Sequence, residues 1–147
     1  MNRHQKHVGI IFSLALLLIL SSCKSSSVET SIPIPTPLPN EGIITGIVNN
    51  LNGEPISDTP VRLAQVYRQD EQGAFVLDLS HSPSSISSAD GKFIILAIPP
   101  AEYLLVVGKP EDNNYIIYQG SDGKPISFTV EGGKIMDAGQ IKVDFKP

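Results

Sequence analysis

Tryptophan is absent from this chain of 147 residues, which holds one cysteine and three histidines. A zinc site rich in cysteine and histidine is therefore excluded, because such sites take three or four ligands mainly from these two residue types. The single cysteine also excludes an internal disulfide. Lys and Arg number 11 against 15 Asp and Glu, for a formal net charge of −4. Because no basic block drives counterion release, we expect no nucleic acid as a partner.

Long apolar stretches are also missing, and the longest covers residues 10–20 with Ser13 as its only polar member. A helix that crosses a bilayer needs about 20 apolar residues, so this run is too short for a permanent span. Arg3 and Lys6 precede the run, and two serines follow it. This order of basic, apolar and small residues is typical of a secretory signal peptide, which we place at residues 1–22.

Cys23 comes directly after this segment, in the sequence Leu20-Ser21-Ser22-Cys23, which closely resembles the lipobox of bacterial lipoproteins. In that family diacylglycerol is attached to the cysteine thiol, the chain is cut just before the cysteine, and the new amino terminus is acylated. The resemblance implies S-diacylglycerol and an N-acyl group, such as palmitate, on Cys23, with membrane lipid as the partner. The alternative is cleavage by the general signal peptidase, which leaves a free thiol that is unusual in a secreted protein.

The lipobox resemblance also implies a location in the cell membrane, lipid-anchored and facing the periplasm or the exterior. In lipoproteins of bacteria with two membranes, an aspartate after the cysteine is the familiar signal for the inner membrane. Lys24 stands there in this chain, which favours the outer membrane. Cleavage after residue 22 removes Arg3 and Lys6, so 9 basic residues remain against 15 acidic ones and the net charge becomes −6.

Residues 23–40 are rich in serine and proline and are predicted to be a linker. Pro33, Pro35, Pro37 and Pro39 each remove a backbone donor and move the preceding residue out of the helical region. An extended path of about 3.1 Å per residue would let this segment reach roughly 50 Å from a membrane. It is either a stalk that lifts a domain off the lipid or a solvated connection with no further role.

Residues 41–147 consist of short apolar runs separated by turn signals, which predicts one all-β domain. Asn-Gly and Asp-Gly pairs, which tolerate positive φ, separate several of the runs. The expected strands lie at residues 43–48, 61–67, 74–79, 92–98, 103–107, 115–118, 126–130 and 140–145. Alternation places the following groups on shared faces: Phe93 and Ile95; Tyr103, Leu105 and Val107; Ile126, Phe128 and Val130; Ile141, Val143 and Phe145.

One pattern occurs twice in this domain. The two copies are Asn52-Gly53-Glu54-Pro55-Ile56-Ser57 and Asp122-Gly123-Lys124-Pro125-Ile126-Ser127. An internal duplication would produce such a match, and so would similar turn chemistry at two strand entries.

The order of motifs over residues 43–143 resembles the carboxypeptidase regulatory-like domain. That family is a transthyretin-like (prealbumin-like) Greek-key β-sandwich of seven strands, which is the fold that the resemblance implies for residues 41–147. Ala101 stands where the family usually has glycine, and residues 130–141 are similar to its last hairpin. The motifs are Gly46-Ile47-Val48, Gly53-Glu54-Pro55-Ile56, Val61-Arg62-Leu63, Asp90-Gly91-Lys92-Phe93 and Pro99-Pro100-Ala101-Glu102-Tyr103.

Candidates for catalysis are few. The signal peptide carries the other two histidines, and the Ser/Pro-rich neighbours of His81 predict an exposed loop, whereas a triad histidine is held by a buried partner. Some related sandwiches form a Lys–Asn isopeptide bond, but the first expected strand has no lysine and the last no asparagine. Related hydroxyisourate hydrolases end in Tyr-Arg-Gly-Ser, which Tyr118-Gln119-Gly120-Ser121 matches only in part. We expect neither enzymatic activity nor a cofactor.

Two kinds of ligand have candidate residues. Sugar sites usually stack rings on exposed aromatic side chains, for which Tyr67, Tyr115 and Tyr118 are available, although the last two also suit the ends of a strand. Oxygen donors gather in Glu111-Asp112-Asn113-Asn114, but a Ca²⁺ site needs about 6–8 converging oxygens. A solvated turn after Pro110 is the alternative, and we assign no metal ligand.

The sequence thus predicts a membrane-anchored lipoprotein of the cell envelope that presents a non-catalytic β-sandwich as a structural or interaction module. A protein partner would pair with an edge strand. The alternative is a surface lipoprotein that binds carbohydrate, so that a glycan is the partner.

Overall fold

The structure, a computed structural model, describes residues 33–69 and 72–146. The predicted signal peptide, Cys23 and the linker up to residue 32 lie outside the described residues, and Ile34–Pro147 forms one compact unit. No helix in the described part of the chain is long and apolar enough to cross a bilayer. The elements are β1 (Gly42–Asn50), β2 (Pro60–Gln69), β3 (Gln72–Val76), β4 (Ser84–Ile86), β5 (Lys92–Ile98), β6 (Ala101–Lys109), the 3₁₀ helix η1 (Pro110–Asp112), β7 (Asn114–Ile117), β8 (Ser127–Val130) and β9 (Ile135–Val143).

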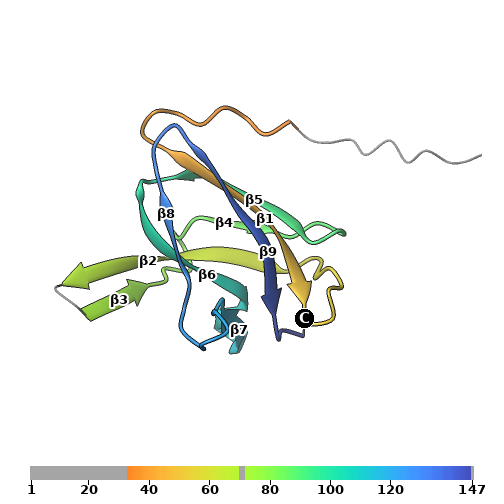
Figure 1. Ribbon diagram of the computed structural model, residues 1–147. Helices are drawn as coiled ribbons and strands as arrows, with labels where there is room; N and C mark the ends of the chain where they lie inside the picture. Colours follow the sequence, from red (N-terminus) through yellow and green to blue (C-terminus); the bar gives the residue numbers. More distant parts are fainter. Residues whose placement is uncertain (1–32, 70–71, 147) are drawn as a thin grey trace, which may run out of the picture. The chain divides into compact units, whose positions relative to one another are not determined.

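The strands form two sheets, which confirms the predicted all-β sandwich (Figure 1). One sheet has the order β5-β1-β9, and the other has the order β3-β2-β6-β7, with β4 also paired to β2 and β8 to β6. The pair β1–β9 is parallel and the others are antiparallel. The described residues contain nine strands, whereas the sequence pattern predicted eight and the family resemblance implied seven. The strand β4, for instance, has three residues, too few to show alternation.

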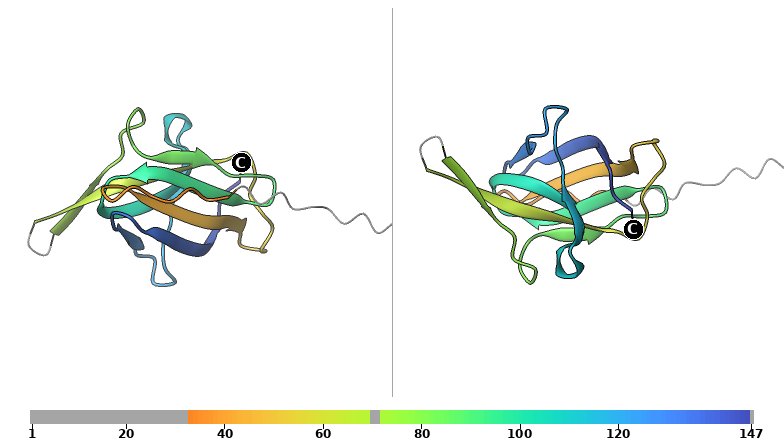
Figure 2. Two further views of the ribbon diagram at one scale, coloured as in Figure 1. Left: turned by 90° about the horizontal axis from the view of Figure 1, so that it is seen from above. Right: turned by 90° about the horizontal axis from the view of Figure 1, so that it is seen from below.

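The side chains predicted to face inward are buried in one core cluster or pack against it. Figure 2 shows the strands from above and from below. Phe93 and Ile95 from one sheet and Leu105 from the other are buried in a single cluster. Central strand β6 is also buried on its second face, where Leu104 and Val106 join a smaller cluster. Simple alternation did not predict this second cluster, because residues from β2, β7 and the segment after β3 cover the outer face of the sheet.

The prediction that residues 130–141 form a hairpin is wrong. Strand β8 pairs with β6 in one sheet, whereas β9 pairs with β1 in the other. The turn between them therefore carries the chain from one sheet to the other. Its glycines are compatible with either connection, so the local sequence did not distinguish them.

The end of the proline-rich segment contacts this turn. The carbonyl oxygen of Leu38 accepts hydrogen bonds from the backbone N–H groups of Glu41 and Gly133, at 3.0 and 2.9 Å. A Cβ atom at Gly132 would lie 2.1 Å from the carbonyl oxygen of Pro39, so glycine permits this close approach. The predicted linker is thus in contact with the sandwich from Leu38 onward.

The two copies of the repeated pattern form the same turn. In the first copy, the backbone N–H groups of Gly53 and Ile56 donate to the carbonyl oxygens of Asn50 and Val48, respectively. In the second copy, the N–H groups of Gly123 and Ile126 donate to the carbonyl oxygens of Gly120 and Tyr118. Both glycines have positive φ, at 87° and 76°. Shared turn chemistry is therefore sufficient to explain the match in sequence.

Candidate functional site

The inner face of β2 extends beyond the part of the sandwich that covers it. Strand β2 pairs with β6 only as far as Gln65, which lies opposite Tyr103, and residues 66–69 pair with β3 alone. Along this face Leu63 belongs to the core, whereas Gln65 is half-buried and Tyr67 is 53% exposed. The hydrophobic core therefore opens at this end of β2.

A cleft of about 470 Å³ lies at this opening. Its floor contains Gln65, Tyr67 and Tyr103, and the end of β5 contributes Leu96 and Ala97. The segment between β3 and β4 supplies polar groups at the rim. A volume of this size falls in the range of about 300–1,000 Å³ that is usual for small-molecule sites.

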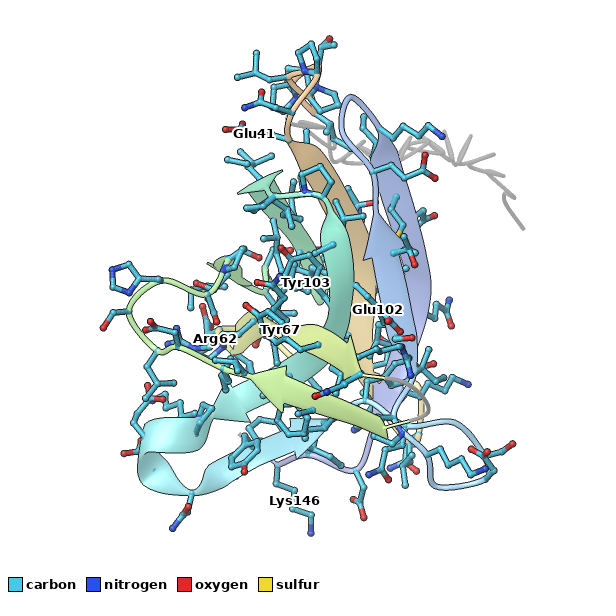
Figure 3. The ribbon with its side chains drawn as sticks, turned by 90° about the vertical axis from the view of Figure 1, so that its left-hand side faces the viewer. Glu41, Arg62, Tyr67, Glu102, Tyr103 and Lys146 are labelled. Carbon is cyan, nitrogen blue, oxygen red and sulfur yellow. The ribbon has the colours of Figure 1, made fainter. Side chains whose placement is uncertain are left out.

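Tyr103 fixes the floor of the cleft. The residue is 2% exposed, and its hydroxyl donates a 2.9 Å hydrogen bond to the carbonyl oxygen of Pro99, at the corner where the chain passes from β5 to β6. Burial, with a smaller contribution from Tyr67, raises the pKa of Tyr103. Figure 3 shows Tyr67 and Tyr103 near each other.

The wall formed by β5 contains a strained residue. Ala97 has φ +53°, in the left-handed region that L side chains rarely adopt, and it lies where the register of β5 against β1 shifts. Among the described residues with positive φ, the other non-glycine positions are Asp58 and Asn113, types that tolerate it better. Ala101, which stands where the family that the sequence resembles usually has glycine, is not among them and begins β6 in an ordinary conformation.

Tyr67 and the adjacent Arg68 each have a side-chain partner, on opposite faces of β2. Its hydroxyl donates a 3.0 Å hydrogen bond to Oε1 of Gln65. On the opposite face, Arg68 forms a two-pronged ion pair with Glu102, in which Nε lies 2.7 Å from Oε2. This pair connects the projecting end of β2 to the start of β6. It also lowers the pKa of Glu102 to about 2, chiefly through the hydrogen bond from Arg68.

The rim of the cleft contains an aspartate and the predicted loop histidine. His81 Nδ1 lies 2.9 Å from Oδ2 of Asp78, and both side chains are exposed, by 83% and 52%. Asp78 Oδ1 accepts the backbone N–H of Ser80 at 2.8 Å, the main reason why the pKa of Asp78 is lowered. The predicted exposed loop at His81 is confirmed, and the loop directs a carboxylate and an imidazole to the cleft.

The other candidate residues lie elsewhere. Tyr115 is 45% exposed on β7, and Tyr118 packs against the core, with its ring centroid 6.2 Å from that of Phe128. Of the three tyrosines, Tyr67 alone lines the cleft. In the acidic segment that was considered for Ca²⁺, Oε1 of Glu111 lies 3.7 Å from Nη2 of Arg62. Within the described residues, no group of three His, Cys, Asp or Glu side chains is placed to hold a metal ion.

Sequence reasoning did not identify Gln65, Asp78, Leu96 or Ala97 as site residues. One signal was present: the inner face of β2 changes from apolar residues to Gln65 and Tyr67. A change of this kind within one face of a strand indicates that the covering layer ends there. No comparable signal marks Leu96 and Ala97.

No known protein family matches the sequence, and none of the curated proteins matches it. A candidate carbohydrate-binding protein from Pseudomonas aeruginosa is 17% identical, with a TM-score of 0.42; the match covers 74% of this chain and 92% of that one. A DUF3823 family protein from Bacteroides uniformis is 18% identical, with a TM-score of 0.42; the match covers 76% of this chain and 44% of that one. A 9R-lipoxygenase from Cyanothece is 15% identical, with a TM-score of 0.41; the match covers 78% of this chain and 18% of that one.

The match therefore spans less than half of the Bacteroides protein and less than a fifth of the lipoxygenase. At 15–18% identity and TM-scores of 0.41–0.42, these likenesses carry no conclusion about fold, activity or ligand.

We predict that Ala97→Gly keeps or raises the free energy of unfolding, by up to about 1 kcal/mol, because glycine adopts positive φ without the left-handed penalty. The matched control Ala101→Gly should lower it by about 0.5–1 kcal/mol, since that residue has no such strain to relieve. Urea unfolding of the full-length protein measures both. Equal losses in the two variants would show that the backbone at Ala97 is not strained.

We predict that the Arg68–Glu102 pair makes stability depend on pH in the acid range. Since the pKa of Glu102 falls from 4.5 to about 2 on folding, the stabilisation is complete above pH 4.5 and is lost as the pH drops through 2. Glu102→Gln should flatten this part of the curve of unfolding free energy against pH. Arg68→Gln should do the same, and the double variant should add nothing further. Unchanged curves in both single variants would contradict the assignment.

Proposed function

We propose that this chain is a lipid-anchored protein of the bacterial cell envelope, whose β-sandwich is a non-catalytic binding module of the carboxypeptidase regulatory-like type. The cleft at the open end of β2 is its binding site. The observation that carries this proposal is the position of Tyr67, a half-exposed aromatic ring on the floor of a cleft with polar groups at its rim.

The anchor rests on the sequence before the sandwich. The apolar run at residues 10–20 and the Leu20-Ser21-Ser22-Cys23 lipobox support acylation of Cys23. Each buried methylene contributes about 0.8 kcal/mol, so two or three acyl chains hold a protein on a bilayer far more firmly than a single chain. Lys24 supports the outer membrane as the destination where a bacterium has two membranes.

The geometry of the cleft supports binding without catalysis. The Asp78–His81 pair is open to solvent, whereas the carboxylate that orients a catalytic histidine is buried and fixes its tautomer. Nearby, Ser82 Oγ accepts the backbone N–H of Asp78 at 2.9 Å and so helps to shape the loop. These groups suit hydrogen bonding to a ligand.

Two partners fit such a module. A protein could add a strand to the outer edge of β3, where Phe75 and Val76 are exposed. A carbohydrate is the second candidate, and the location of Tyr67 inside the cleft favours it.

We predict that Cys23→Ala reduces metabolic labelling with an alkyne-tagged fatty acid to background, because the thiol that receives diacylglycerol is gone, and releases the protein from membranes. Ser22→Ala, which keeps a small residue before an intact cysteine, should label like the natural sequence. Mass spectrometry of the mature amino terminus identifies the attached groups. Labelling that persists in Cys23→Ala, or an unmodified terminus in the natural sequence, would refute the anchor.

A further inference from the structure

We infer that the cleft binds a sugar ring that carries no acidic group, with Tyr67 as the surface on which the ring stacks. This inference rests on the proposed function, since it names the ligand class of the same cleft. It follows from three properties of the site: the position of the Tyr67 ring, the hydrogen-bonding groups around it, and the sign of the charge on the residues that line the cleft.

The ring of Tyr67 is positioned as a stacking surface. The side chain is 53% exposed, although it stands on the inner face of a strand on which Val61 and Leu63 are fully buried. Its hydroxyl is bonded to Gln65, and the neighbouring Arg68 is bonded to Glu102, so the side chain and its backbone are fixed before a ligand arrives. A pre-positioned aromatic ring loses little conformational entropy on binding. The apolar C–H face of a pyranose ring matches such a surface.

The polar groups at the cleft provide both donors and acceptors. Because Gln65 Oε1 accepts from Tyr67, the Nε2 amide of Gln65 is left to donate, with no acceptor among the described residues. Asp78 has four lone-pair sites, three of which are engaged by the loop, so it can accept one more hydrogen bond. His81 bonds through Nδ1 and leaves Nε2 for a ligand. Sugar hydroxyls both donate and accept, so they can use all three groups.

The charge of the site excludes acidic ligands. Asp78 carries a lowered pKa and is ionised at neutral pH, and none of the described residues that line the cleft is lysine or arginine. Arg68 lies on the other face of β2 and is paired with Glu102. A uronic acid or a sugar phosphate would therefore meet a like charge with no cation to offset it, apart from an imidazole already bonded to that carboxylate.

Isothermal titration of the full-length protein in a sugar-free detergent tests the inference, because alkyl glycoside detergents would occupy the cleft. The probes are the methyl glycosides of glucose, galactose and mannose, with glucuronic acid as the acidic counterpart. We expect at least one neutral glycoside to bind with a millimolar or lower Kd, and glucuronic acid to bind at least tenfold more weakly.

Variants locate the binding. Tyr67→Ala should weaken it at least tenfold, while Tyr67→Phe, which keeps the ring but not the hydroxyl, should stay within about threefold. Tyr115→Ala removes a tyrosine of similar exposure outside the cleft and should stay within twofold. Circular dichroism confirms that each variant is folded.

Absence of binding by all three neutral glycosides, preference for glucuronic acid, or equal losses in Tyr67→Ala and Tyr115→Ala would overturn the inference. The proposed function fails separately, if fatty acid does not label Cys23 or if a photo-crosslinker at Tyr67 captures neither a glycan nor a protein on cells. Capture of a protein alone would retain the binding module and reject the sugar.

Discussion

The hydrogen bond from the Tyr103 hydroxyl to the Pro99 carbonyl closes the corner at which the chain leaves one sheet and enters the other. The residues before the corner, Leu96 and Ala97, form one wall of the cleft, and the residue paired with Tyr103 is Gln65, on its floor. A buried hydrogen bond of this kind contributes only about 1 kcal/mol to stability. Its larger effect is geometric, because it ties the start of β6 to the corner that directly follows the cleft residues Leu96 and Ala97.

The cleft follows from two sheets of unequal extent. The strand β2 continues four residues past its last pair with β6, supported by β3 on one side and by the Arg68–Glu102 ion pair on its outer face. Residues there change from core-forming types to Gln65 and Tyr67. The exposed aromatic ring is thus a consequence of strand length, and it gives an otherwise closed sandwich a surface for binding. A lipid anchor at Cys23 would keep that surface at the cell envelope.

Much of the fold was predictable from local pattern, because alternation in a half-buried strand reports directly which side faces the core. Ile141, Val143 and Phe145 are buried as expected, and the repeated Asn-Gly and Asp-Gly turns form as their chemistry predicts. The prediction that β8 and β9 form a hairpin was wrong, because a glycine-rich turn does not specify the sheet that receives the next strand. The cleft was not predicted, because it combines residues from β2, β5 and a loop that are far apart in the sequence. The register shift at Ala97 was not predicted either, because an alanine does not indicate one. The acylation of Cys23 stays a prediction, since it lies outside the described residues.

The most direct test of this account is the unfolding free energy and amide hydrogen exchange of Tyr103→Phe, which removes one hydroxyl and leaves the buried ring. The account predicts a loss of about 1 kcal/mol, with faster exchange concentrated at the corner between β5 and β6 and little change along β1 and β9. Unchanged stability, or faster exchange spread evenly over both sheets, would contradict the role of this bond in fixing the corner beside the cleft.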